Sequence, residues 1–236
     1  MLIEIRDTLL NLLFPRRCPI CDEPVKFGKG LICPPCLTRI SYLDSPTCLK
    51  CGKKLHNEAE YCQDCAARSH SFDRGMALFE YQSIAGAIYR FKYKGRHEYA
   101  DFFGSEICGK LGEDILRLKP DCLIPVPIHA KRLRTRGYNQ ATALAKVISE
   151  RLNIPLNEKI IRRVRPTKPL KNLNLQERQN NLKKAFKIER NDVKLNTIII
   201  IDDIFTTGST IDAMSEELRR IGVKKVYFVA LSIGKY

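Results

Sequence analysis

The sequence lacks any apolar run long enough to cross a membrane. No uncharged stretch reaches the roughly 18 to 20 residues that a transmembrane helix needs. A secretory signal is also missing, because residues 1–14 have no basic start, carry Glu4 and Asp7, and lead into Pro15-Arg16-Arg17-Cys18 instead of a small-residue cleavage site. We therefore expect a cytoplasmic protein with no transmembrane segment.

An amphipathic helix is expected at residues 1–16 instead. Its apolar residues fall on one helical face: Leu2, Ile5, Leu9, Leu12 and Leu13. Such a face packs on the rest of its own protein or lies on a membrane surface, and the first outcome is the more common. The second would make the protein peripheral to the membrane.

Acidic residues are scarce relative to basic ones. The chain has 26 Asp and Glu against 41 Lys and Arg, a formal charge of +15. Two zinc ions, each held by four thiolates, would lower this to about +11. A basic surface of this size indicates a polyanionic partner, which is either a phosphorylated sugar or a nucleic acid. With 236 residues, the chain can form one good core and a small module.

Cysteine is abundant, and eight of the ten cysteines stand in C-x-x-C pairs that repeat after about thirty residues. The pairs are Cys18-x2-Cys21 with Cys33-x2-Cys36, and Cys48-x2-Cys51 with Cys62-x2-Cys65. Two such hairpins form a tetrahedral four-sulfur site that suits Zn²⁺. Disulfides would need an oxidising compartment, and iron–sulfur ligation is the other alternative. We expect a double zinc ribbon at residues 17–70 whose zinc is structural, because four protein ligands leave no open position.

The spacing leaves two questions about this module open. Each repeat can close on itself, or hairpins can pair across the repeats. The module also carries basic residues that either contact nucleic acid or balance the charge of the thiolates: Lys26, Lys29, Lys50, Lys53, Lys54 and His56.

The rest of the chain is organised around residues 197–210. The β-branched run 198–201 is typical of a central strand covered on both faces. We expect it to stop at about Ile201, so that Asp202 and Asp203 lie together in a turn. A loop rich in hydroxyl groups then opens a helix, and free N–H groups at a helix N-terminus form a phosphate cradle. Taken singly, these parts could be a solvated turn and an ordinary helix cap.

The order of these parts resembles the ribose-phosphate signature of type I phosphoribosyltransferases. The resemblance implies that Asp202 and Asp203 accept hydrogen bonds from the ribose 2′- and 3′-hydroxyls. It also implies that the loop holds the 5′-phosphate through Thr206, Thr207, Gly208, Ser209 and Thr210.

A cationic segment precedes residues 197–210 in the chain. A short strand at 123–127 leads into residues 128–140, which we expect to be a loop before the helix 141–152. In a parallel sheet both loops would open at the same edge, so the cations would face a departing pyrophosphate. The pattern P-V-P-x-H-x-x-R-x-x-x-R-G-x-N-Q, placed after paired C-x-x-C hairpins, resembles the ComF/ComFC competence family. The matching positions are Pro125, Val126, Pro127, His129, Arg132, Arg136, Gly137, Asn139 and Gln140.

This resemblance covers nearly the whole chain and implies an α/β fold. We expect a type I phosphoribosyltransferase-like parallel sheet flanked by helices at residues 72–236, preceded by the small double zinc ribbon. The pyrophosphate-side loop would use His129, Lys131, Arg132, Arg134, Arg136, Gly137 and Asn139. A hood over the site would use Thr167, Arg178 and Asn181. Family members usually have glutamine where this chain has Leu170, which leaves catalytic turnover in question.

Three functions follow from the resemblance. The preferred one is handling of single-stranded DNA in natural transformation, with DNA-uptake machinery at the inner face of the membrane as a partner and phosphoribosyl diphosphate or a related phosphosugar in the pocket. The second is phosphoribosyl transfer with Mg²⁺, in which Asp202, Asp203, Arg132 and Arg136 are catalytic. Here the acceptor would be a base or amine, and the absence of an N-terminal cysteine weakens a glutamine-dependent reaction. The third is a regulatory sensor of the diphosphate.

Aromatic and cationic residues alternate at 90–96. Rings and cations interleaved in this way can bind single-stranded nucleic acid. A helix with aromatic residues inward and cations outward gives the same string, and this alternative is favoured.

Overall fold

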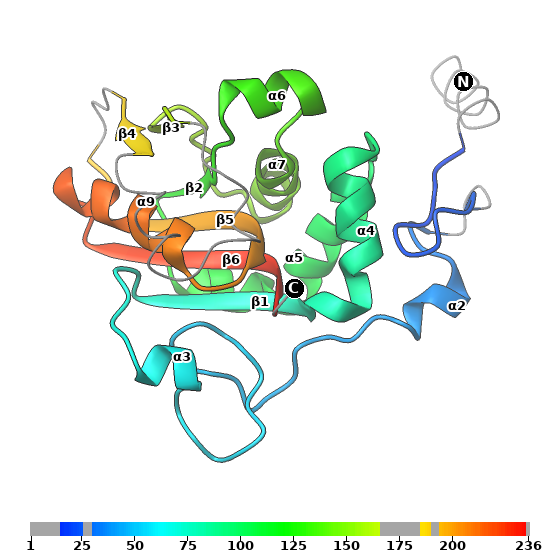
Figure 1. Ribbon diagram of the computed structural model, residues 1–236, viewed down its shortest axis with the longest axis horizontal. Coiled ribbons are helices and arrows are strands. Elements are labelled where there is room, and N and C mark those ends of the chain that lie inside the picture. Colours follow the sequence, from blue (N-terminus) through cyan, green and yellow to red (C-terminus); the bar gives the residue numbers. More distant parts are fainter. Residues whose placement is uncertain (1–14, 26–29, 166–184, 190–193, 235–236) are drawn as a thin grey trace.

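The computed structural model describes residues 15–25, 30–165, 185–189 and 194–234. A four-stranded parallel sheet lies at the centre of this part of the protein (Figure 1). Its spatial order is β1 (Arg74–Glu80), β6 (Lys225–Ile233), β5 (Thr197–Phe205) and β2 (Cys122–Pro125). An antiparallel pair is separate from it and consists of β3 (Ile161–Arg163) and β4 (Phe186–Ile188). The expected α/β fold with a parallel sheet is confirmed.

Strand β5 is central because both of its faces are covered. All four isoleucines from Ile198 to Ile201 are completely buried. Since side chains alternate along a strand, Ile198 and Ile200 enter the core on one face, and Ile199 and Ile201 enter the core on the other. A run of consecutive aliphatic residues therefore indicates a strand that is packed on both sides.

Helices cover the two faces of the sheet unequally. On one face lie α4 (Tyr81–Tyr93), α5 (Tyr99–Arg117) and α7 (Gln140–Leu152), and on the other lies α9 (Ser209–Arg220) (Figure 1). The apolar side chains of α9 recur every three or four positions, and Ile211, Met214 and Leu218 are buried against the sheet. In the described residues, no helix is both long and apolar enough to span a membrane.

Two local expectations are wrong. Strand β5 continues past Ile201 to Phe205, because the neighbouring strand keeps pairing with it through Ile204 and Ser232. The segment 128–140 contains a helix, α6 (Ala130–Arg136), where we expected only a loop. Most of its residues are cationic, so the sequence lacks the regular spacing of apolar residues by which a helix is predicted.

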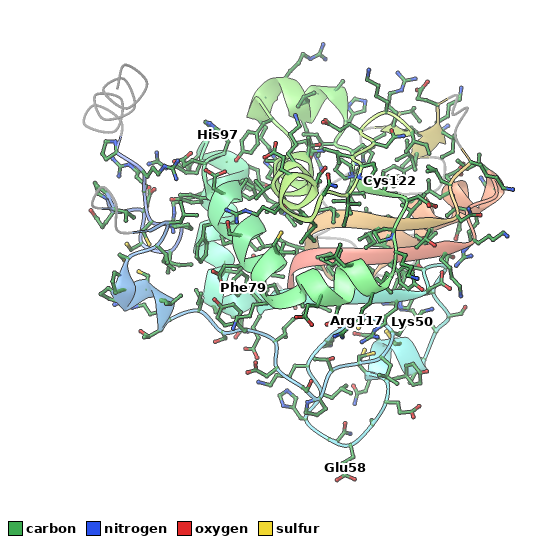
Figure 2. All side chains as sticks on the ribbon, turned by 180° about the vertical axis from the view of Figure 1, so that it is seen from behind. Lys50, Glu58, Phe79, His97, Arg117 and Cys122 are labelled. Carbon is green, nitrogen blue, oxygen red and sulfur yellow. The ribbon has the colours of Figure 1, made fainter. Side chains whose placement is uncertain are left out.

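The cysteine repeats attach to the sheet domain at different places. The first ribbon (residues 17–25 and 30–40) contains α2 (Pro34–Leu37) and lies beside α4 (Figure 1). The second ribbon (residues 46–66) contains α3 (Gln63–Ala66) and lies along β1, where the Gly75 N–H donates to the Lys50 carbonyl at 2.8 Å. Figure 2 shows Glu58 at the tip of the second ribbon, pointing away from the sheet.

Two expected segments lie outside the described residues. These are the amphipathic helix at 1–16, of which only the last two residues are described, and most of the hood, at 166–184.

Candidate functional site

The segments that follow β2 and β5 begin side by side. The two strands are parallel, with Pro125 paired to Ile201, and the Val126 N–H donates to the Ile201 carbonyl at 2.9 Å. The cationic segment and the Asp202 segment therefore start at the same edge of the sheet, as the sequence predicts.

The loop of residues 206–208, together with the first turn of α9, forms a segment that we call the phosphate loop (206–210). Gly208 adopts a left-handed conformation with φ of 79°, and its carbonyl accepts from the Asp212 N–H at 2.8 Å, which starts the helix. Within the described part of the chain, the N–H groups of Thr206, Thr207 and Gly208 donate no hydrogen bond. Backbone donors without partners at the positive end of a helix suit an anion.

Two side chains from beyond the second ribbon hold this loop. Arg68 donates to the Thr207 carbonyl at 2.6 Å, and His70 bonds Asp212 of α9 through Nδ1 at 2.8 Å. The ring of His70 lies directly against Gly208, where an added Cβ would come within 2.9 Å of His70 Cε1. Glycine is therefore required at position 208 both for its φ and for this contact. Neither Arg68 nor His70 carried a sequence signal, since each lies about 140 residues away from its partner.

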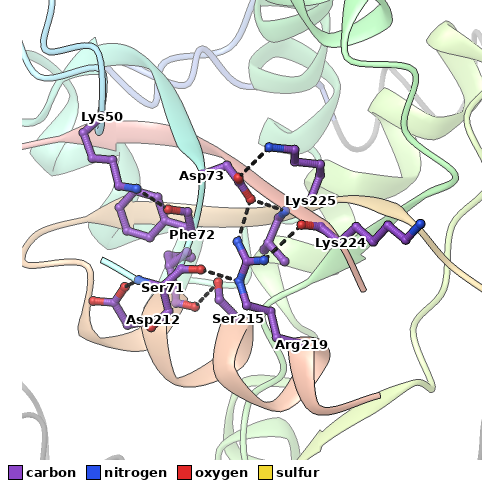
Figure 3. Close-up of polar contacts among 11 residues, drawn as sticks. Lys50, Ser71, Phe72, Asp73, Asp212, Ser215, Arg219, Lys224 and Lys225 are labelled. Atoms are coloured by element: carbon purple, nitrogen blue, oxygen red, sulfur yellow. Dashed lines mark hydrogen bonds and ion pairs between the residues drawn. The ribbon is translucent and has the colours of Figure 1, made fainter. Parts of the chain in front are cut away.

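The linker that follows His70 is fastened to α9 and β6 (Figure 3). The Ser71 N–H donates to Asp212 at 2.8 Å, and Arg219 donates to the Ser71 carbonyl at 2.8 Å and to Asp73 at 2.7 Å. Burial would raise the pKa of Asp73, but hydrogen bonds from the Val226 N–H and the neighbouring cations lower it on balance. The linker that follows the second ribbon is thus hydrogen-bonded to α9, the helix that begins at the phosphate loop.

The two acids of β5 leave opposite faces of the strand, since the strand does not end before them. Asp203 pairs with Lys92 of α4 at 3.0 Å, and its N–H donates to the Asp202 carboxylate at 2.8 Å. Burial and the nearby Asp203 carboxylate raise the pKa of Asp202 to about 7. Asp202 can therefore change charge near neutral pH. The Lys92 pairing was not predicted.

Three residues of the pyrophosphate-side segment (residues 128–140) cap the helices α6 and α7. His129 begins α6 by accepting from the Lys131 N–H at 3.2 Å, and Gly137 ends it at a φ of 84°. Asn139 caps α7 and also donates to the Val126 carbonyl at 2.9 Å. These three residues have structural roles here, which by itself explains their types.

The cations of this segment differ in exposure. Lys131 and Arg134 are exposed, whereas Arg132 is half-buried. Arg136 bonds Gln140 and lies over the Tyr93 ring, with 5.1 Å from Cζ to the ring centroid.

A buried guanidinium links the two halves of the site. Arg163 of β3 lies over Phe186 of β4, 5.5 Å from the ring centroid. Burial and the nearby Arg132 lower the pKa of Arg163 to about 10, while Asp202 opposes that change. The charges of Arg132 and Asp202 thus act on Arg163 in opposite directions. The hood residues Thr167, Arg178 and Asn181, and also Leu170, lie outside the described residues.

A large cavity opens beside the pyrophosphate-side segment. It has a volume of about 1730 Å³ and lies between α5, α6, α7 and β3, with His129, Arg136, Gly137 and Asn139 in its wall. None of residues 202–210 is among its described lining residues. Beside Thr206, a cavity of about 20 Å³ reaches toward the second ribbon, which is room for one water. The roles of residues 202–210 in binding ribose phosphate therefore stay predictions.

The cysteines form two four-sulfur clusters, each within one repeat. In each cluster the ligand atoms lie within 4.8 Å of one another, which answers the question of pairing. The Sγ–Sγ distances of 3.7 Å for Cys21–Cys33 and 3.8 Å for Cys51–Cys62 fit the edges of a tetrahedron with a Zn–S bond of about 2.3 Å. The clusters are consistent with two zinc sites. His56 is exposed and belongs to neither.

The described lysines of the second ribbon have partners within the protein. Lys50 donates to the Phe72 carbonyl, Lys53 pairs with Asp64 at 3.4 Å and Lys54 pairs with Glu80 at 3.6 Å. None of these partners is a thiolate, so the contacts do not decide between balancing the thiolate charge and contacting nucleic acid.

Residues 90–93 end a helix, as favoured from the sequence, and Phe91 is fully buried. Arg90 donates to the Ile20 carbonyl at 2.6 Å, so it contacts the first ribbon. Tyr93 departs from the expectation, because it points outward and is 62% exposed.

Comparison with known proteins covers almost the entire chain. Residues 9–66 match the family model of the double zinc ribbon domain, and residues 137–233 match that of the phosphoribosyl transferase domain. Competence protein F of Haemophilus influenzae is 31% identical over 90% of this chain and 95% of its own length. DNA utilization protein YhgH of Escherichia coli is 28% identical over 91% of this chain and 96% of its own length. Competence protein ComFC of Bacillus subtilis is 27% identical over 76% of this chain and 74% of its own length.

Proposed function

Because the chain belongs to the ComF/ComFC competence family, we propose that it handles single-stranded DNA in natural transformation and binds a phosphoribosyl compound at its phosphate loop. The names of its relatives refer to competence and DNA utilization, and the charge of +15 suits a polyanion. The proposed location is cytoplasmic, with DNA-uptake proteins at the inner face of the membrane as partners.

The observation that carries the ligand assignment is the set of three loop N–H groups at the start of α9 that have no acceptor among the described residues. These groups would hold the phosphate of phosphoribosyl diphosphate or ribose 5-phosphate. Asp202 and Asp203 would accept from the ribose hydroxyls. Mg²⁺ would accompany the diphosphate, and Arg132 and Arg136 would face its charge.

Two titrations test this proposal. Ribose 5-phosphate should bind the protein and lose at least about tenfold in affinity in Thr207→Ala, which removes one hydroxyl of the loop. Single-stranded DNA should bind at 50 mM salt and dissociate as salt rises. Absence of DNA binding at 50 mM salt, or binding that does not depend on salt, would contradict DNA handling. Absence of sugar-phosphate binding would contradict the pocket assignment.

Phosphoribosyl transfer is a second candidate, favoured by the electrostatic interactions of Arg163 with Arg132 and Asp202. If it occurs, Asp202→Asn and Asp203→Asn should each abolish pyrophosphate release from the diphosphate while the protein stays folded. Binding without release, across bases and amines as acceptors, would rule it out.

A further inference from the structure

Two tyrosines on α4 stand out because they are exposed next to one another. Tyr89 is 54% and Tyr93 is 62% exposed, and their ring centroids lie 5.2 Å apart. They lie one helical turn apart, so they form a short aromatic strip on the surface. Burial does not explain them, since other aromatic residues, such as Phe91, fill the core beneath this helix.

The strip lies at the mouth of the large cavity. Arg136, which is part of the cavity wall, lies over the Tyr93 ring, and Gly95, two residues after Tyr93, lines the same cavity. Inside, His97 and Tyr138 face each other with ring centroids 6.1 Å apart. Aromatic surface therefore continues from the strip into the groove.

The groove carries an excess of positive charge. Its cations are Arg136, Lys146, Lys159, Arg162 and Arg163, and its acids are Asp101, Glu158 and Glu189. Lys146 pairs with Glu158 at 3.4 Å and Arg162 pairs with Glu189 at 2.6 Å, which offsets two of the five cations. Lys159 is exposed and has no ion pair among the described residues. The walls therefore keep a net attraction for an anion.

We propose that this groove and the strip of Tyr89 and Tyr93 form the binding site for single-stranded DNA, with the backbone along the cations and bases on the two rings. A basic groove beside aromatic side chains is the combination that binds single strands without sequence preference. The assignment rests on the proposed function and adds the site to it. None of residues 202–210 is among the groove's described lining residues, but the groove shares Arg136 with the proposed diphosphate site, so the two sites adjoin.

The test uses fluorescence anisotropy with a labelled single-stranded oligothymidylate of about 20 nucleotides and an abasic oligomer of equal length. The double variant Tyr89→Ala/Tyr93→Ala should bind the thymidylate at least about tenfold more weakly, because base stacking is lost. The slope of affinity against salt should stay unchanged, since no charge is removed. The abasic oligomer should bind the wild type and the double variant equally.

Three variants serve as controls. Tyr89→Phe/Tyr93→Phe should restore affinity. Tyr61→Ala, which removes a tyrosine that is 45% exposed on the second ribbon, should change nothing. Lys159→Ala should make the salt slope shallower by about 0.7. Ribose 5-phosphate affinity should remain intact in all of these variants, which shows that they are folded.

The outcomes separate the two proposals. If the wild-type protein binds no single strand, the proposed function fails and this site fails with it. If the wild type binds but the double tyrosine variant binds equally well, only the site assignment is wrong. Equal losses for the thymidylate and the abasic oligomer would also overturn it, because they would show that bases do not stack on the strip.

Discussion

The two ribbons each carry two C-x-x-C pairs, separated by eleven residues in the first and by ten in the second, but they are attached to the rest of the protein in different ways. The first has a small cluster of its own, with Cys18, Val25 and Cys36, and it also packs on the core beneath α4 and α5 through Ile32 and Ile40. Polar contacts tie it to the same helices and to the segment between them. The second contributes Cys48 and Cys51 to the main core of the protein. The two ribbons therefore join the cores on opposite faces of the sheet, and only the second lies on the face that carries α9 and the phosphate loop.

This difference indicates that a zinc ribbon can position the residues of a binding site without contacting the ligand itself. Arg68 and His70 follow the second ribbon by only a few residues, and both contact the phosphate-loop segment. The equivalent stretch after the first ribbon instead leads along residues 41–43 to β1, with hydrogen bonds from Leu43 and to Ser41. Losing one metal should therefore have different consequences from losing the other.

Removing one ligand from each ribbon gives the largest expected effect. Cys51→Ser should lose the second metal, lower the free energy of unfolding by about 3 kcal/mol or more, and abolish ribose 5-phosphate binding. Cys21→Ser should lose the first metal but keep that binding within about threefold. Metal content, calorimetry and a sugar-phosphate titration measure the pair. Equal loss of binding in both variants would remove the distinction between the ribbons.

Gly208→Ala should have the next largest effect. The alanine would be strained at a φ of 79° and would collide with His70, so we expect a loss of about 2 to 3 kcal/mol in unfolding free energy and at least tenfold in affinity for ribose 5-phosphate. Gly222→Ala, at the other end of α9, has a φ of 94° and open space around it. It should cost about 1 kcal/mol and leave binding unchanged. Similar results for the two would show that the His70 contact is unimportant.

Arg68→Ala should weaken sugar-phosphate binding by about tenfold, because it removes a charged hydrogen bond worth about 1.5 to 3 kcal/mol that positions the loop. Arg96→Ala, which removes an ion pair between Asp22 of the first ribbon and the segment that joins α4 to α5, should leave that affinity unchanged. Titration calorimetry on both variants decides whether the second ribbon's linker positions the loop.

The smallest expected effect concerns the docking of the first ribbon at low pH. Burial raises the pKa of Asp22, but hydrogen bonds from Tyr99 and Arg96 outweigh it, so the pKa lies below its usual value near 3.8. A lowered pKa means that this stabilisation is present above the unfolded-state pKa and is lost as pH falls through the folded-state pKa. Asp22→Asn should thus reduce Tm at pH 7, and the difference from the wild type should shrink as pH falls below 3.8 toward the folded-state pKa. A constant difference would show that the charge is unimportant.

Much of the fold could be predicted from local sequence patterns. The isoleucine run 198–201 indicated the central strand, and the cysteine spacing indicated both four-sulfur clusters. The end of β5 could not be predicted, because pairing with β6 carries it on to Phe205. Helix α6 was missed because its caps, His129 and Gly137, flank a run without apolar periodicity.

The candidate site was predicted in its motifs but not in its supports. Arg68, His70 and Lys92 lie more than 100 residues from the groups that they contact, and no local pattern reveals such contacts. The acids Asp202 and Asp203 were expected side by side in a turn, whereas strand geometry places them on opposite faces. Long-range packing, which spacing does not encode, decides these features.

Hydrogen exchange of residues 203–212, measured with and without ribose 5-phosphate, tests the central claim most directly. Without ligand, the N–H groups of Thr206, Thr207 and Gly208 should exchange fast, because no group in the described part of the chain accepts from them. Saturating ligand should slow exchange in this segment in the wild type, but not in Cys51→Ser. Binding of the sugar phosphate with no protection at 203–212 would contradict the account.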